Sequence, residues 1–140
     1  MTEHKWLDHY PDGVDWNAPI PANPLYVLMD DAVARFPQRP CLDFLGRIYT
    51  YSELDGLIDR ATAGFQRLGV GKGIKVGLFL PNCPQSVISY YAILKAGGTV
   101  VNYSPLYSAP ELLFQIEDSQ TDIMVTLNLA ALYPKAQAML

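Results

Sequence analysis

The side chains best suited to nucleophilic or acid–base catalysis are few in this sequence. Its only histidines are His4 and His9, and its only cysteines are Cys41 and Cys83, which have no metal-ligand spacing such as C-x2-C. Both histidines stand in a segment without helical or strand periodicity, where a histidine is usually solvated. Cys83 precedes an expected helix, which favours a thiolate, but no histidine is near it to act as a base. The residues therefore identify no catalytic residue, no cofactor-binding residue and no metal ligand.

A glycine-rich run at residues 69–73, GVGKG, has the composition of a phosphate-binding loop but not its context. A dinucleotide-binding loop follows a strand and opens a helix, whereas this run follows a helix and opens a strand. It is not a Walker A sequence, because glycine follows Gly71-Lys72 and Gln66 stands where the first glycine belongs. We predict a plain turn between a helix and a strand.

The charged residues have structural explanations. Glu53 and Glu111 each stand three residues after a hydroxyl residue, Thr50 and Ser108, a spacing typical of a capping box. Lys95 lies in the last turn of an expected helix, where a cation suits the helix dipole. No pairing that would indicate an acid–base site is evident for the other carboxylates considered, which are Asp30-Asp31, Glu117-Asp118 and Asp122.

Proline, glycine and apolar spacing divide the chain into elements. Residues 1–22 predict an extended arm whose apolar anchors pack against the domain; these are Trp6, Leu7, Tyr10, Val14 and Trp16. Asn23-Pro24 is expected to open a helix that ends at Pro37, with an apolar stripe of Leu25, Leu28, Met29, Ala32 and Phe36. A hairpin turning at Gly46 follows, with strands over 40–45 and 47–50.

Helices and strands then alternate. Helices are expected over 50–68, from Pro84 to Gly97-Gly98, from Ser108 onward and over 130–140. Strands are expected at 76–80, 99–102 and 123–127. The residues expected to face inward from the helix after Pro84 are Val87, Ile88, Tyr91 and Leu94.

This order predicts an α/β fold, with a mostly parallel sheet and flanking helices, preceded by the arm and a small β-hairpin. We predict an arm over 1–22 and an incomplete α/β subdomain over 23–140. Ligands gather at the carboxyl ends of parallel strands, here Asn82-Cys83 and Asn102-Tyr103-Ser104. The favoured alternative is that Asn82 and Ser104 merely shape turns.

Composition narrows the classes of partner. The chain has 140 residues, half of them apolar, and a net charge of −4 with ten scattered lysines and arginines. No basic stripe exists to follow a phosphate backbone, so nucleic acid is not expected as a partner. The acidic, polar N-terminus does not resemble a signal peptide, and no apolar run approaches the ~18–20 residues of a membrane span. A cytoplasmic location is expected, with peripheral membrane association left open.

Several stretches, in order, resemble the N-terminal end of the adenylate-forming (AMP-binding) superfamily, and most closely a bacterial long-chain fatty acid–CoA ligase. The resemblance covers nearly the whole chain; its most specific stretches are 93–98 (ILKAGG), 100–107 (VVNYSPLY), Glu111-Leu112 and Asp118-Ser119. Further stretches are Trp6-Leu7, Tyr10-Pro11, Val14, 34–37 (ARFP), 49–54 (YTYSEL) and 71–82 (GKGIKVGLFLPN). Tyr103-Ser104 departs from the pair that the long-chain branch usually carries before its proline.

The resemblance implies a parent acyl-CoA synthetase that activates a long-chain fatty acid with ATP and Mg²⁺ and transfers the acyl group to coenzyme A. It also implies a phosphate loop rich in serine, threonine and glycine, an acidic residue that holds the ribose, and a C-terminal lysine. None of these has a matching position here.

We therefore expect an N-terminal fragment that is inactive alone and binds no cofactor. The alternative is a stand-alone, non-catalytic binding or interaction module. Exposed apolar surface predicts a homo-oligomer, by exchange of the arm or terminal helix.

Overall fold

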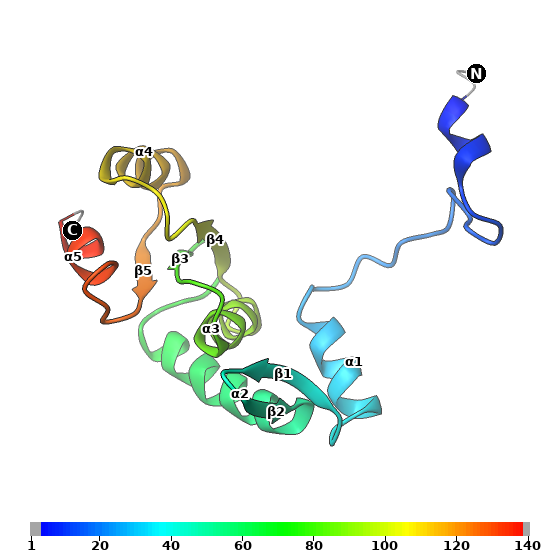
Figure 1. The fold of residues 1–140 in the computed structure, drawn as a ribbon, viewed down its shortest axis with the longest axis horizontal. Coiled ribbons are helices and arrows are strands. Elements are labelled where there is room, and N and C mark those ends of the chain that lie inside the picture. Colours follow the sequence, from blue (N-terminus) through cyan, green and yellow to red (C-terminus); the bar gives the residue numbers. More distant parts are fainter. Residues whose placement is uncertain (1–3, 139–140) are drawn as a thin grey trace.

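The computed structural model describes residues 4–138, in which an N-terminal arm precedes an α/β body (Figure 1). The arm contains a short 3-10 helix, η1 (Lys5–His9). The elements of the body are α1 (Val27–Arg35), β1 (Pro40–Phe44), β2 (Arg47–Thr50), α2 (Tyr51–Arg67), β3 (Lys75–Phe79), α3 (Pro84–Lys95), β4 (Thr99–Tyr103), α4 (Ala109–Ser119), β5 (Ile123–Thr126) and α5 (Tyr133–Gln137). No helix among residues 4–138 combines the length and apolar character needed to cross a membrane.

The central sheet has the strand order β4-β3-β5, and both pairings are parallel. Val76 in β3 pairs with Val100 on one side and with Ile123 on the other. The connections run through α3 and α4, as the alternation of strands and helices predicts. The predicted α/β fold with a parallel sheet is thus confirmed.

Helices cover both faces of this sheet. On one face, Val76 and Leu78 pack with Ile93 of α3, and on the other, Phe79 packs with Leu112 of α4 and Ala136 of α5. Burial on both faces explains why β3 reads as a continuous apolar run rather than an alternating one.

A third apolar cluster lies among the helices, where Met29 of α1 packs with Leu54 and Ile58 of α2 and with Ala92 of α3. Because α3 is covered by the sheet and by α2, it lacks a single apolar stripe. Of the residues predicted to face inward, Val87, Ile88 and Tyr91 pack against this cluster, as expected. All three and Leu94 are nevertheless partly exposed, and Ser89, Ala92 and Ile93 are more deeply buried.

The hairpin of β1 and β2 turns through Leu45 and Gly46, as predicted. Phe44 pairs with Arg47, so the loop has two residues, and their φ angles are +52° and +82°. Positive φ at both loop residues is the mark of a type I′ turn, whose twist matches that of the flanking strands.

The first helix begins later than predicted. Asn23 is not its N-cap, because α1 starts at Val27 after a turn in which the Val27 N–H donates to the carbonyl of Pro24. Only Met29 of the expected stripe is buried, and Leu28 is 63% exposed. Since α1 contacts the body mainly through α2 (Figure 1), only a narrow face of it is covered.

The expectation that the arm packs against the domain is wrong. Its five apolar anchors are exposed, and the arm extends away from the body (Figure 1). The aromatic rings contact one another instead: the Trp16 ring centre is 6.0 Å from that of Trp6 and 5.3 Å from that of Tyr10. The arm is also not wholly extended, because η1 interrupts it.

The C-terminal helix is shorter than the predicted span 130–140. Residues 130–132 form a turn before α5, and residues 139–140 lie outside the described residues. Pro134 lies in the first turn of α5, where a proline is accommodated and helps to place the helix start.

Candidate functional site

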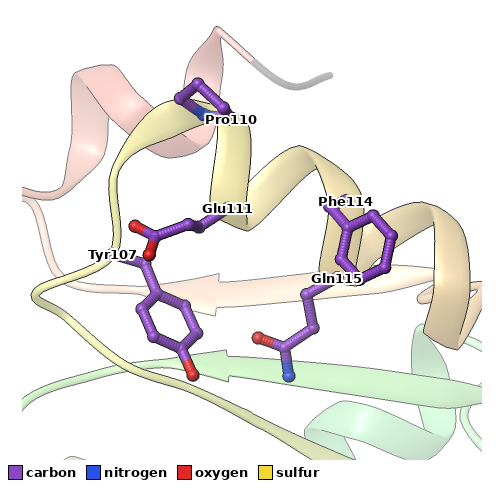
Figure 2. Close-up of a pocket in the computed structure, with 5 residues that line it drawn as sticks. All are labelled: Tyr107, Pro110, Glu111, Phe114 and Gln115. Carbon is purple, nitrogen blue, oxygen red and sulfur yellow. The ribbon is translucent and has the colours of Figure 1, made fainter.

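A hollow lies beside the first turns of α4 (Figure 2). Its volume is about 460 Å³, and it is lined by Tyr107, Pro110, Glu111, Phe114 and Gln115. The loop after β4 carries Tyr107, and the helical spacing of the other four brings them to one side of α4. In Figure 2, the Tyr107 ring and the Gln115 amide flank the hollow.

The polar groups of the hollow are already partly engaged. Gln115 Nε2 donates to the Asn102 carbonyl at 3.0 Å, whereas its Oε1 is buried without a partner. The Glu111 carboxylate accepts hydrogen bonds from the Ser108 N–H at 2.8 Å and the Ser108 hydroxyl at 2.6 Å. These bonds, the hydroxyl first, lower the pKa of Glu111, so this carboxylate stays ionised.

This arrangement suits binding better than catalysis. The apolar faces of Tyr107, Pro110 and Phe114 can hold an apolar group. Glu111 is the one carboxylate among these lining residues, and neither histidine nor lysine is among them. Among residues 4–138 no group of three His, Cys, Asp or Glu side chains could hold a metal ion.

The two strand ends named from the sequence do not share one hollow. Asn82 and Cys83 line a separate hollow of about 260 Å³, where β1 and the start of α3 contribute Asp43 and Ser86. Ser104 shapes a turn, because its hydroxyl accepts from the Leu106 N–H at 3.3 Å and its carbonyl from the Tyr107 N–H at 3.1 Å. For Ser104 the turn alternative is confirmed.

The histidines and cysteines also lie apart. His4 stacks near Trp6 in the arm, with 4.6 Å between ring centres, and His9 is exposed. Burial raises the pKa of the Cys41 thiol, although a hydrogen bond with Tyr51 opposes this, and Cys83 is buried at the N-cap of α3. Neither histidine is among the residues that pack with Cys41 or that line the hollow at Cys83.

The glycine run forms the predicted turn between α2 and β3. Gly69 and Gly73 have φ angles of +86° and +91°, which glycine adopts without strain. Gly98, beyond α3, allows a close approach instead, since a Cβ atom there would lie 2.7 Å from Cγ1 of Val70. These glycines therefore serve packing and turn geometry rather than phosphate binding.

An ion cluster at Lys95 was not predicted. Lys95 Nζ lies 3.0 Å from Asp30 Oδ1, 3.2 Å from Asp55 Oδ1 and 3.1 Å from Asp59 Oδ1. Burial alone lowers the pKa of Lys95, but the three carboxylates outweigh it and raise this pKa well above the usual range. The cluster ties α1 and α2 to α3 and is structural. The signal in the sequence that could have indicated this cluster is the pair Asp55 and Asp59, which lie one helical turn apart and so face the same side of α2.

Tyr103 is buried beneath α4, where its hydroxyl group is hydrogen-bonded. Its hydroxyl shares hydrogen bonds with Ser119 Oγ at 3.0 Å and with Thr121 Oγ1 at 2.6 Å. The Tyr103 side chain thus joins β4 to the end of α4 and the turn that follows it.

Comparison with known proteins identifies the family. The family model described as AMP-binding enzyme matches residues 29–139. The chain belongs to the AMP-binding enzyme family. This confirms the resemblance to adenylate-forming enzymes inferred from the motifs.

Curated relatives from this family include long-chain fatty acid–CoA ligases. The chain is 39% identical over 136 residues to that of Bacillus subtilis (strain 168), a match that covers 97% of this chain and 24% of the relative. It is 35% identical over 130 residues to that of Escherichia coli O6:H1, covering 88% of this chain and 22% of the relative. The chain thus spans about a quarter of the length of these relatives.

Two solved structures share the fold. The N-terminal domain of FACL13 from Mycobacterium tuberculosis superposes with a TM-score of 0.76 at 22% identity, covering 83% of this chain and 30% of that one. VinN in complex with L-aspartate superposes with a TM-score of 0.78 at 19% identity, covering 84% of this chain and 30% of that one. At such identities the likeness concerns the fold alone.

Proposed function

We propose that this chain serves as the N-terminal part of a long-chain fatty acid–CoA ligase. The whole enzyme uses ATP and Mg²⁺ to convert a fatty acid to an acyl-adenylate and passes the acyl group to coenzyme A. The observation that carries the proposal is the 39% identity to the B. subtilis long-chain ligase over 97% of this chain. A 4-coumarate–CoA ligase from Arabidopsis thaliana is 33% identical over a shorter stretch of 96 residues, which makes the long-chain acid the better-supported substrate.

The segment contributes a scaffold rather than reacting groups. Adenylation requires groups that position the acid and ATP and stabilise charge on the transferring phosphate. The hollow at α4 offers apolar walls, an ionised carboxylate engaged in a helix cap and one amide oxygen. Residues 1–140 alone are therefore proposed to be inactive and to hold no cofactor.

A chimera tests this function. Residues 1–140 replace the matching segment of the B. subtilis ligase, and formation of acyl-CoA from a long-chain fatty acid is measured. A folded chimera with activity within about tenfold of the parent is expected, because the reacting groups remain. Retained stability with loss of all adenylation would contradict the proposal. The isolated chain is assayed beside it for acid-dependent ATP–pyrophosphate exchange, and none is expected.

The second candidate is a non-catalytic binding module. It is supported by the hollow at α4, whose walls suit an apolar ligand. Binding of a fatty acid to the isolated chain, measured by isothermal titration calorimetry and lost in Phe114→Ala, would favour this candidate over a scaffold role.

The proposal includes location and assembly. A reaction that consumes ATP and coenzyme A fits a cytoplasmic location, with or without peripheral contact with a membrane, and fractionation of cells tests it.

The chain is also proposed to self-associate through the exposed apolar surface of α4, where Phe114 is 71% exposed and Leu113 is 46% exposed. Sedimentation of Phe114→Asp beside the native chain tests this contact.

A further inference from the structure

A hollow lies between α2 and α3, on the side of the sheet opposite α4 (Figure 1). Its volume is about 280 Å³, and it is lined by Ala61, Gly64, Phe65 and Leu68 of α2 and by Ser89 of α3. An apolar cavity of about 150 Å³ can hold one benzene molecule, so this hollow has room for roughly ten carbon atoms. The residues that α2 contributes carry no polar side-chain group, which favours an apolar ligand.

Ser89 gives this hollow one polar point. It is 8% exposed, and no hydrogen bond of its hydroxyl group is found within residues 4–138. A serine or threonine within a helix can donate to the carbonyl four residues earlier, as Thr62 of α2 does with Ile58 at 2.9 Å. Because the Ser89 hydroxyl is not engaged in this way and Ser89 lines the hollow, it can bond to a polar group of a ligand.

Arg67 brings a positive charge to the same hollow. A Cβ atom on Gly64 would lie 4.0 Å from Nη2 of Arg67, so the guanidinium group extends back along α2 toward a residue of the lining. Arg67 is exposed, and it forms no ion pair with any of residues 4–138. Its guanidinium group can therefore bind a carboxylate on the solvent side of the hollow.

The walls of the hollow are held in place by packing and by a bond between the helices. Phe65 packs against two of the apolar clusters of the body. Thr62 Oγ1 lies 3.4 Å from the Ala92 carbonyl and so joins α2 to α3. A hollow that exists before the ligand arrives favours binding, because little of the protein has to be ordered.

We propose that this hollow binds a hydroxyaryl carboxylic acid. The aromatic ring packs against Phe65, the hydroxyl group shares a hydrogen bond with Ser89, and the carboxylate pairs with Arg67. A ring is favoured over a flexible chain, because it loses less conformational freedom on binding and can stack on another ring. The binding is separate from the activity proposed above, since it uses residues of α2 and α3 alone.

Three matched probes test this site. They are 6-hydroxy-2-naphthoate, 2-naphthoate, which lacks the hydroxyl group, and 2-naphthol, which lacks the carboxylate. Their dissociation constants are measured by isothermal titration calorimetry on the 140-residue chain. A Phe114→Ala background is used throughout, so that the hollow at α4 contributes little to binding.

The variants remove one feature of the site at a time. Ser89→Ala removes the hydroxyl group, and Arg67→Gln removes the charge. Gly64→Leu fills the hollow with a side chain that is well suited to a helix. Ala63→Leu, at an exposed position of the same helix, is its matched control. Circular dichroism confirms that each variant is folded.

The parent is expected to bind the hydroxynaphthoate at least about fivefold more tightly than either of the other probes. Ser89→Ala should lose the preference for the hydroxyl group and keep that for the carboxylate, and Arg67→Gln should do the reverse. Gly64→Leu should weaken binding of the hydroxynaphthoate at least about tenfold, whereas Ala63→Leu should leave it unchanged.

Three results would overturn the proposal: no binding of the hydroxynaphthoate at millimolar concentration, equal binding of the three probes by the parent, or preferences that survive in both Ser89→Ala and Arg67→Gln. Unchanged binding in a folded Gly64→Leu chain would do so as well. If Gly64→Leu does not fold, the comparison of probes still decides, because the other two variants each replace a single polar group.

Discussion

The ring of Tyr103 lies against the backbone of Gly77 on the central strand. A Cβ atom on Gly77 would be 2.6 Å from Cε2 of Tyr103 and 3.0 Å from Sδ of Met124. Because β3 pairs with a strand on each side, its backbone cannot move aside without disturbing both ladders. The absence of a side chain at position 77 is what allows the Tyr103 ring to approach β3 so closely.

Gly77→Ala should therefore destabilise the chain. The added methyl group overpacks the face beneath α4, and we expect a loss of about 1–3 kcal/mol in the free energy of unfolding. Urea denaturation measures it. Gly71→Ala is the matched control, because a Cβ atom there would have nothing within 4 Å. Equal losses in the two variants would show that glycine at 77 serves another purpose.

Tyr103→Phe should cost stability through the lost hydroxyl. Removing it leaves Ser119 Oγ and Thr121 Oγ1 without the bonds of 3.0 Å and 2.6 Å that they share with it. We expect a loss of about 1 kcal/mol by thermal or urea unfolding. Tyr107→Phe serves as control, since no hydrogen bond of the Tyr107 hydroxyl is found within residues 4–138, and it should be close to neutral.

Lys95→Met should loosen the packing of α1. The change leaves Asp30, Asp55 and Asp59 to repel one another around an uncharged side chain. Because two of the three carboxylates are well exposed, solvent screens part of this, and a loss of about 1–2 kcal/mol is expected. Hydrogen exchange should rise most in α1. The control is Lys72→Met, on the exposed turn after α2. It should change neither the free energy of unfolding nor the hydrogen exchange of α1.

Acid should weaken the two capping boxes. The backbone N–H of Thr50 first, and then its hydroxyl, lower the pKa of Glu53; hydrogen bonds from Ser108 do the same for Glu111. A depressed folded pKa adds stability that is present above the ordinary value of 4.5 and is lost as pH falls through the folded pKa. Melting temperatures from about pH 6 to about pH 3 should therefore fall less in Glu53→Gln than in the native chain.

Glutamine keeps the geometry of a capping box but does not titrate in this range. Glu117→Gln, outside both boxes, should retain the full acid dependence of the native chain. A native-like acid dependence in Glu53→Gln would contradict the assignment of this effect to the cap.

Leu45→Asn should stabilise the hairpin. Leu45 has a φ of +52° in the type I′ turn and is 91% exposed, so its side chain gains little from the body. Asparagine adopts this left-handed conformation more readily, and a gain of about 1 kcal/mol in the free energy of unfolding is expected. Leu106→Asn, at an equally exposed position without positive φ, should give no such gain.

The sheet, its helices and both capping boxes could be predicted because local signals agree there. Val76 and Leu78 belong to a continuous apolar run, which is typical of a strand that is buried on both faces. Thr50 and Ser108 each stand three residues before a glutamate, which is the spacing of a capping box. Pattern reasoning was less accurate for α3, whose Ser89 is buried, because a helix covered on two sides loses its periodicity.

The arm and the ion cluster depend on relations that a linear pattern does not contain. Trp6 and Trp16 were expected on the domain because large apolar residues are usually buried, but a proline-rich segment keeps them away from it. Lys95 meets Asp30 only after α1 and α3 have packed against α2. The hollow at α4 likewise depends on how Tyr107 and Gln115 lie after the loop has turned, which spacing alone does not specify.

The order of the strands in the sheet has a consequence for synthesis on the ribosome. The first strand of the sheet to be made, β3, occupies its centre, and β4 and β5 then pair with its two sides. Each later strand therefore finds an edge that already exists, and no strand has to be inserted between two others. A nascent chain can assemble this sheet in the order of translation, with each crossover helix covering a face soon after its strand emerges.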